Sequence, residues 1–214
     1  MEEKLEKFDS KEDSQYRRIY GAVAWPGKRP GFAVIVGQTQ TWRLGGFDMV
    51  FLDEIEDENL HHLVRRCGVL DFRYQPEMWI GDWKNPAADR FIQEMNAEFA
   101  DSQSVKLGRR QFALKGSLIL EMKENMFAYL FPILKSLLDK DHRRLFIRED
   151  SKLREYMAQP QPGEIADFKQ GDWPAIEALG LAVCELEAQT KRSMGLPKPL
   201  MVIKTQSFFL GTSR

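Results

Sequence analysis

The sequence predicts an α/β domain built on a mixed sheet, in which a three-strand antiparallel meander precedes parallel strands and helices cover both faces. Three apolar, strand-length segments follow one another with only short, turn-rich connections, as in an antiparallel meander. Further strand-length segments then alternate with segments of helical periodicity, which is typical of parallel strands covered on both faces. With 43% hydrophobic residues among 214, the chain can bury the core of one domain.

The expected meander comprises residues 18–25, 32–40 and 47–53. The turn 26–31 (PGKRPG) separates the first two strands, and Gly45-Gly46 precedes the third. An acidic run over 53–58 follows, and we interpret it as the start of a helix, because carboxylates are favourable near helix N-termini.

The later elements are expected from apolar spacing and from helix-start residues. A domain over 17–190 would follow a charged lead-in (1–16) and precede a tail (191–214). The expected elements are a helix from 60 to about 68, a strand at 78–82, a helix at 85–99, a basic connection at 102–115, a helix at 118–138 with a kink or restart at Pro132, a strand at 144–148, a short helix at 151–157, a last helix at 173–189 with Asp172 as N-cap, and an edge strand at 200–204.

Composition excludes several classes of protein. The net charge of −1 excludes a uniformly basic nucleic-acid binder, although a local basic face remains open. Cys67 and Cys184 lie inside apolar helical patterns, so we expect buried thiols and a reducing compartment. No apolar run approaches the roughly 18 residues that span a bilayer. We therefore expect a soluble, intracellular protein with no membrane partner.

Acidic residues mark the candidate site. Asp82 ends the strand in EMWIGDWKNPAAD (77–89), where open α/β sheets place their chemistry, although a carboxylate there also suits a turn cap. Asp172 and Glu177 fall on the first turns of the last helix. Carboxylates from separate elements can hold two divalent ions, and oxygen ligands of this kind suit Mg²⁺ or Mn²⁺.

Four pieces of the chain carry a resemblance to a known family. They are IYGAVAWPGKRPGFAVIVG (19–37), VFLDEIEDENLHHLVRR (50–66) with MWIGDWKNPAADRFIQEMN (78–96), LFPILKSLLDKDHRRLFIREDSKLREYM (130–157) and GDWPAIEALGLAVCEL (171–186). In this order they resemble the ribonuclease H-like nuclease domain of the large terminase subunit of tailed bacteriophages. The resemblance implies a metal-dependent DNA endonuclease that acts in genome packaging, encoded by a phage or prophage and working in the cytoplasm of the bacterial host.

By this resemblance Asp82 is the second metal ligand and Glu177 the last, with Asp172 a helper. The family's first ligand, an Asp in the first strand, corresponds here to Ala24, which cannot bind a metal. A site without this ligand would either bind magnesium poorly or borrow Asp53 or Glu54 from the neighbouring strand end. The alternative is a catalytically impaired module of the packaging machinery that binds DNA or protein, and a third interpretation is an ordinary α/β domain whose acids are caps and surface residues.

Basic residues provide candidate contacts to double-stranded DNA. Lys28 and Arg29 lie at the predicted hairpin tip, and Lys106, Arg109 and Arg110 lie in the connection 102–115. Ordinary solvated loops are the alternative for both segments. No GxxxxGK[ST] phosphate loop occurs, so the ATPase motor of a terminase large subunit is not in this sequence. By the resemblance the chain is an isolated nuclease-like domain, either a fragment or a stand-alone relative, and an ATPase or another packaging protein is a candidate partner. Trp79, Trp83 and Trp173 surround the proposed acids, and core packing explains them better than base stacking.

Overall fold

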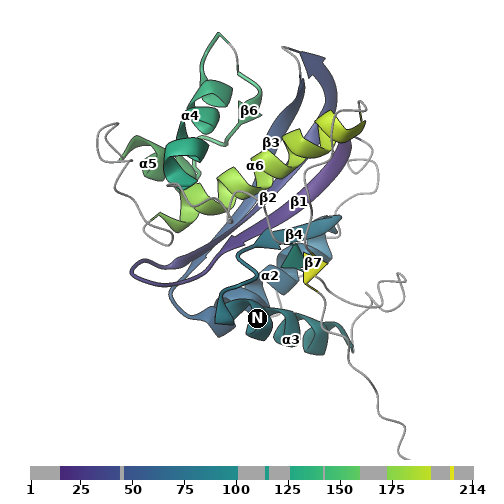
Figure 1. Ribbon diagram of the computed structural model, residues 1–214, viewed down its shortest axis with the longest axis vertical. Helices are drawn as coiled ribbons and strands as arrows, with labels where there is room; N and C mark the ends of the chain where they lie inside the picture. The colour runs from purple at the N-terminus through teal and green to yellow at the C-terminus, as the bar shows by residue number, and fades with distance from the viewer. Residues whose placement is uncertain are drawn as a thin grey trace, which may run out of the picture.

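The protein folds around a seven-stranded mixed sheet, seen in a computed structural model (Figure 1). The structure describes residues 15–43, 46–100, 114–115, 126–141, 143–159, 173–193 and 203–204. Strands follow one another across the sheet in the order β6-β3-β2-β1-β4-β5-β7. The predicted mixed α/β class is confirmed, and β1 and β4 are neighbours in the sheet.

The meander consists of β1 (Tyr16–Ala24), β2 (Gly31–Arg43) and β3 (Gly46–Asp57), paired antiparallel in sequence order. The interpretation of the acidic run 53–58 as a helix start is wrong, because β3 continues to Asp57. Alternation along this part of β3 buries Ile55, while Glu54 and Glu56 receive hydrogen bonds from the segment 151–156. Asn59 caps the next helix instead, accepting from the backbone N–H of His61.

Beyond the meander, β4 (Met78–Gly81) pairs parallel with β1, and β5 (Leu114–Lys115) pairs parallel with β4. Lys115, expected at the end of the basic connection, therefore lies in a strand. On the far edges, β6 (Leu145–Phe146) pairs parallel with β3, and β7 (Ile203–Lys204) pairs antiparallel with β5. The expected edge strand at 200–204 is observed over Ile203–Lys204, and its first part, 200–202, lies outside the described residues.

Helices cover both faces of the sheet. One face carries α2 (Leu60–Tyr74) and α3 (Pro86–Ala100), and the other carries α4 (Met126–Leu138), α5 (Lys152–Ala158) and α6 (Pro174–Ser193). The structure extends α2 beyond the expected end at Gly68, to a cap at Gln75 in the left-handed region (φ 46°). Pro132 lies inside α4. No helix in the described part of the chain combines the length and apolar character needed to cross a bilayer.

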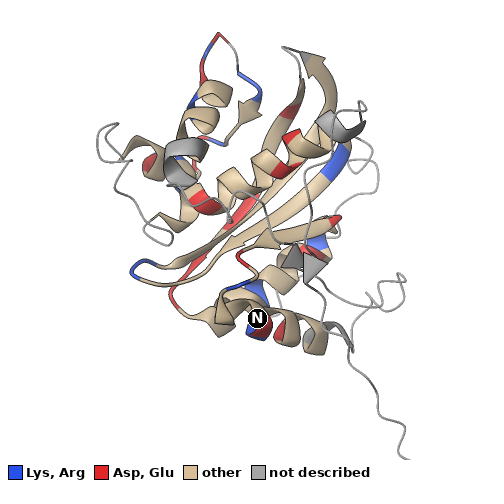
Figure 2. Ribbon diagram, viewed as in Figure 1, with Lys and Arg blue, Asp and Glu red and all other residues tan. Residues whose placement is uncertain are grey.

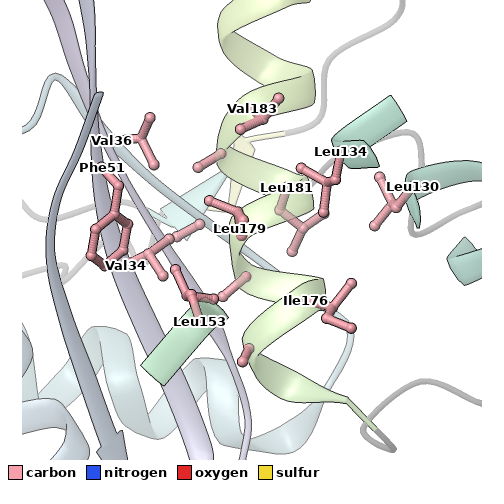
Figure 3. Packing of buried hydrophobic residues seen from close by; sticks show 14 of the residues in the cluster. Val34, Val36, Phe51, Leu130, Leu134, Leu153, Ile176, Leu179, Leu181 and Val183 are labelled. Carbon is pink, nitrogen blue, oxygen red and sulfur yellow. The ribbon is translucent and has the colours of Figure 1, made fainter. Parts of the chain in front are cut away.

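Two apolar cores result, one on each face. The larger core packs α6 between the sheet and the helices α4 and α5, and its labelled members are shown in Figure 3. They come from β2 and β3 (Val34, Val36, Phe51), from α6 (Ile176, Leu179, Leu181, Val183) and from α4 and α5 (Leu130, Leu134, Leu153). The apolar residues of α6 are therefore buried on several sides, which fixes this helix across the sheet.

The second core holds Trp79 against the opposite face of the sheet. Its indole N–H donates to the buried Asp71 carboxylate of α2 over 2.9 Å. Gly21 on the neighbouring strand leaves room for the ring, because a Cβ there would come within 2.6 Å of it. Trp79 is therefore a core residue, as the sequence favoured.

Candidate functional site at the ends of strands 1 and 4

Ala24 and Asp82 follow the last residue pair between β1 and β4, which joins Val23 to Gly81. Because strands alternate faces, Ala24 lies on the α6 face together with Tyr20 and Ala22, and these residues share one buried cluster. Ala24 is only 1% exposed. The position where the resemblance expects the first carboxylate is therefore a buried methyl group beside Asp82.

Asp82 is held in the turn between β4 and α3. Its carboxylate accepts from the backbone N–H of Lys84 over 3.0 Å, which is an Asx turn. Its main-chain carbonyl accepts from the Trp25 indole over 2.9 Å and from the Asn85 N–H over 3.3 Å. Asp82 thus shapes its turn, and this local role exists with or without a metal.

Glu177 lies in the first turn of α6 and is only 2% exposed. This helix contacts β1, β2 and β4, and its neighbouring residues Ile176 and Ala178 share the buried cluster of Ala24. The helix that carries Glu177 therefore contacts β4, the strand that Asp82 follows. Asp172 lies outside the described residues.

Asp53 lies on the opposite face of the sheet. It pairs with Ile35, a member of the core beneath α2, and paired residues of an antiparallel ladder share a face. Its carboxylate accepts from the Tyr74 hydroxyl over 3.0 Å and pairs with Arg73 over 3.3 Å, both on α2. The structure therefore ties Asp53 to α2, on the face opposite Ala24.

Glu54 lies on the α6 face but serves as an anchor for α5. It accepts from the Ser151 hydroxyl over 2.9 Å and from the Lys152 backbone N–H over 2.8 Å. Glu56, two residues further along β3, accepts a hydrogen bond from Lys152 Nζ over 2.6 Å and another from the Tyr156 hydroxyl. Both carboxylates therefore attach α5 to β3.

Burial raises the pKa of Tyr156 to about 12, and its hydrogen bond to Glu56 contributes in the same direction. Burial alone would raise the pKa of Glu56, but the bonds from Lys152 and Tyr156 hold it below its ordinary value. No sequence pattern predicted this anchor. Contact between a strand and a helix about 100 residues later has no local signal.

These side chains do not fit a two-metal centre. Within the ranges that the structure describes, no three His, Cys, Asp or Glu side chains are grouped so that they could hold a metal ion. Ala24 supplies no ligand, Asp53 is bound to Arg73 and Tyr74, and Glu54 is bound to α5. Asp82 and Glu177 remain as candidate ligands: Glu177 lies on α6, and Asp82 follows β4, a strand that α6 contacts.

Of the predicted basic residues, Lys28 and Arg29 are described, while Lys106, Arg109 and Arg110 fall outside the described residues. Lys28 is exposed at the β1–β2 turn. The Arg29 guanidinium lies over the Trp173 ring, 3.7 Å from its centre. The sequence pointed to Arg29 as a DNA contact and to Trp173 as a core residue, but it did not predict that they touch.

The fold resembles two solved nucleic-acid-processing structures. The first is the crystal structure of the nuclease domain of g2p, the large terminase of bacteriophage SPP1, with bound Mn. The likeness covers 84% of this chain and 92% of that chain, at 16% identity and a TM-score of 0.47. The second is RuvC from T. thermophilus in complex with Holliday junction substrate, with coverages of 85% and 99%, 12% identity and a TM-score of 0.39.

No protein-family model and no curated protein matches the sequence. The sequence pieces resemble a terminase nuclease domain, and the fold of the chain also resembles that of a solved terminase nuclease domain. At these identities and TM-scores the likeness concerns the fold alone. The function of the chain must therefore be inferred from its own residues.

Proposed function

We propose that this chain is a DNA-binding domain of the packaging machinery, with the ribonuclease H-like arrangement of a terminase nuclease but without two-metal cleavage. The observation that carries the proposal is Ala24, a buried residue at the end of β1 beside Asp82. A two-metal site needs carboxylates from several elements at this point, and here the first of them is missing.

Basic residues at the same end of the sheet support contact with DNA. Figure 2 shows the β1–β2 turn, which contains Lys28 and Arg29, as a blue segment where the hairpin ends. Lys84 is exposed in the turn after Asp82. Positive charge around the ends of β1 and β4 favours binding of the DNA phosphate backbone. An ATPase or another packaging protein is the further partner that we propose.

Cleavage is the second candidate, because the chain retains Asp82 directly after β4 and Glu177 on α6, a helix that contacts β4. In that case the chain would be a weak Mg²⁺- or Mn²⁺-dependent endonuclease with Asp82, Glu177 and Asp172 as its acids. The two candidates differ in one measurable property. The first predicts binding without cutting, and the second predicts cutting that depends on Asp82.

The test combines a DNA-binding assay with a plasmid-nicking assay in Mg²⁺ or Mn²⁺. We expect the wild type to retain duplex DNA in a salt-sensitive manner and to leave the plasmid intact. Nicking by the wild type that Asp82→Asn abolishes would establish the endonuclease instead. A wild type that neither binds nor cuts DNA would exclude both candidates.

A rescue variant sharpens the comparison. Ala24→Asp restores a carboxylate beside Asp82, and we expect Mn²⁺-dependent nicking that the double variant Ala24→Asp/Asp82→Asn lacks. A buried carboxylate is costly, so folding of Ala24→Asp must be checked by circular dichroism. The matched control is Ala22→Asp, which adds the same charge to the same strand and face two residues earlier.

A further inference from the structure

We infer that Arg29, oriented by Trp173, binds a backbone phosphate of DNA directly, so that DNA binding at this site needs no divalent metal. This inference rests on the proposed DNA-binding function and names the group that would carry it. In this inference Trp173 holds the Arg29 guanidinium in position and does not stack on a DNA base.

Arg29 is held against an aromatic ring. Its guanidinium lies 3.7 Å from the centre of the Trp173 ring, which is within the range of a cation–π contact. Trp173 is itself fixed: it is 8% exposed and packs edge-on against Tyr156, with ring centres 6.5 Å apart. Tyr156 in turn packs against Phe32 and donates to Glu56. Arg29 therefore rests on an ordered surface.

The N–H donors of Arg29 differ from those of other arginines in this fold. Other arginines of the fold use theirs internally: Arg144 bonds to Glu187 over 2.7 Å and Arg73 to Asp53 over 3.3 Å. In the described structure, the Arg29 guanidinium forms no comparable hydrogen bond or ion pair, and its contact is with the ring face. A stacked guanidinium keeps its N–H edge directed outward, in the fork geometry that suits a phosphate.

The Arg29 guanidinium lies at the end of the sheet that carries the candidate site. Arg29 lies in the turn that joins Ala24 to Phe32, which are paired at the end of the β1–β2 hairpin. Ala24 and Asp82 directly follow Val23 and Gly81, the last paired residues of β1 and β4. Trp173 immediately precedes α6, the helix that carries Glu177. A fixed side-chain cation thus lies at the sheet end where the resemblance expects metal ions. The ligand that fits it is a phosphodiester.

The test is the affinity for a labelled DNA duplex, measured by fluorescence anisotropy with EDTA and, separately, with Mg²⁺. We expect EDTA to change the dissociation constant of the wild type by less than about twofold, since the cation is a side chain. Arg29→Ala should weaken binding about tenfold or more, as loss of a charged hydrogen bond does. It should also reduce the salt slope by about one. The control Arg66→Ala removes an exposed arginine from α2, on the opposite face, and should leave the affinity within about twofold.

Two further variants keep the test decisive. Trp173→Leu retains Arg29 but removes its support, and should weaken binding by less than Arg29→Ala while preserving the salt slope. If Arg29→Ala does not fold, Arg29→Gln, which keeps most of the side-chain length, is measured instead with the same expectation.

The failures of the two proposals can be told apart. Wild-type binding that Arg29→Ala leaves unchanged, or that EDTA abolishes, would overturn the inference and leave DNA binding standing. A wild type that binds poly-glutamate but no duplex would overturn both, and would indicate an acidic protein partner for Arg29. A wild type that binds neither probe would likewise overturn both.

Discussion

The indole N–H of Trp25 donates a 2.9 Å hydrogen bond to the main-chain carbonyl of Asp82, 57 residues away. Trp25 follows β1 directly and Asp82 follows β4 directly, so this bond joins the ends of the two parallel strands. Trp25 also packs edge-on against Phe91 of α3, with ring centres 5.3 Å apart. The turn that carries Asp82 is therefore fixed by tertiary contacts.

Trp25→Phe tests this link. The variant keeps an aromatic ring in the core but removes the donor, so we expect a loss of about 1–3 kcal/mol in the free energy of unfolding. The measurement is urea denaturation followed by circular dichroism. Trp42→Phe, at a residue that is 42% exposed, is the control and should change stability by less than about 0.5 kcal/mol. Equal losses in the two variants would contradict the prediction.

Gly21→Ala tests the packing of Trp79 against β1. The new Cβ would lie 2.6 Å from the indole ring, so we expect a cost of about 1–3 kcal/mol from overpacking. Gly27→Ala provides a matched control, since a Cβ there meets nothing within 4 Å. A Gly21→Ala protein with the wild-type urea midpoint would show that the ring moves aside freely.

Glu56→Gln tests the attachment of α5 to β3 through its pH dependence. The pKa of Glu56 is held below its ordinary value of 4.5, so its ionised form stabilises the fold. This contribution is fully present above about pH 4.5 and is lost as the pH falls through the lower pKa of the folded state. We expect Glu56→Gln to lower the urea midpoint at pH 7 and the difference from wild type to shrink near pH 3.

The control for this titration is Glu58→Gln, which alters an exposed carboxylate in the following turn. It should shift the midpoint little at pH 7. A wild-type advantage over Glu56→Gln that is the same at both pH values would contradict the proposed ionic role of Glu56.

Cys67 should be chemically protected. It is fully buried in α2, and burial raises the pKa of its thiol well above the ordinary range. In a Cys184→Ser variant, we expect a thiol reagent at pH 8 to leave the native protein unlabelled and to label it fully in urea. Rapid stoichiometric labelling of the native variant would show that Cys67 is accessible. Cys184 is half-buried, so its removal isolates the Cys67 signal.

Much of the fold could be predicted from local patterns. Turn residues and alternation fixed the order of the meander, and helical spacing located the helices, because both signals lie within a few residues of each other. The start of α2 at Leu60 agrees with the expected start, but Gln75, and not the region near Gly68, ends the helix. The acidic run before Asn59 belongs to β3 and its following turn, not to the helix.

The candidate site was predictable only in part. The missing carboxylate at Ala24 and the position of Asp82 after a buried strand can both be recognised in the sequence. The role of Asp53 could not, because a bulge in β3 pairs Val36 with Phe51 but Ile35 with Asp53. Regular alternation would put residues 51 and 53 on one face, and the bulge separates them.

The sequence by itself thus determined the order of the elements, the mixed sheet and the absence of a first-strand acid, since these depend on residue type and short-range spacing. Only the tertiary structure decided that Asp53 turns toward Arg73 and Tyr74, and that Arg29 rests on Trp173. Such pairings depend on strand register and on contacts between segments far apart in the chain. No local pattern encodes them.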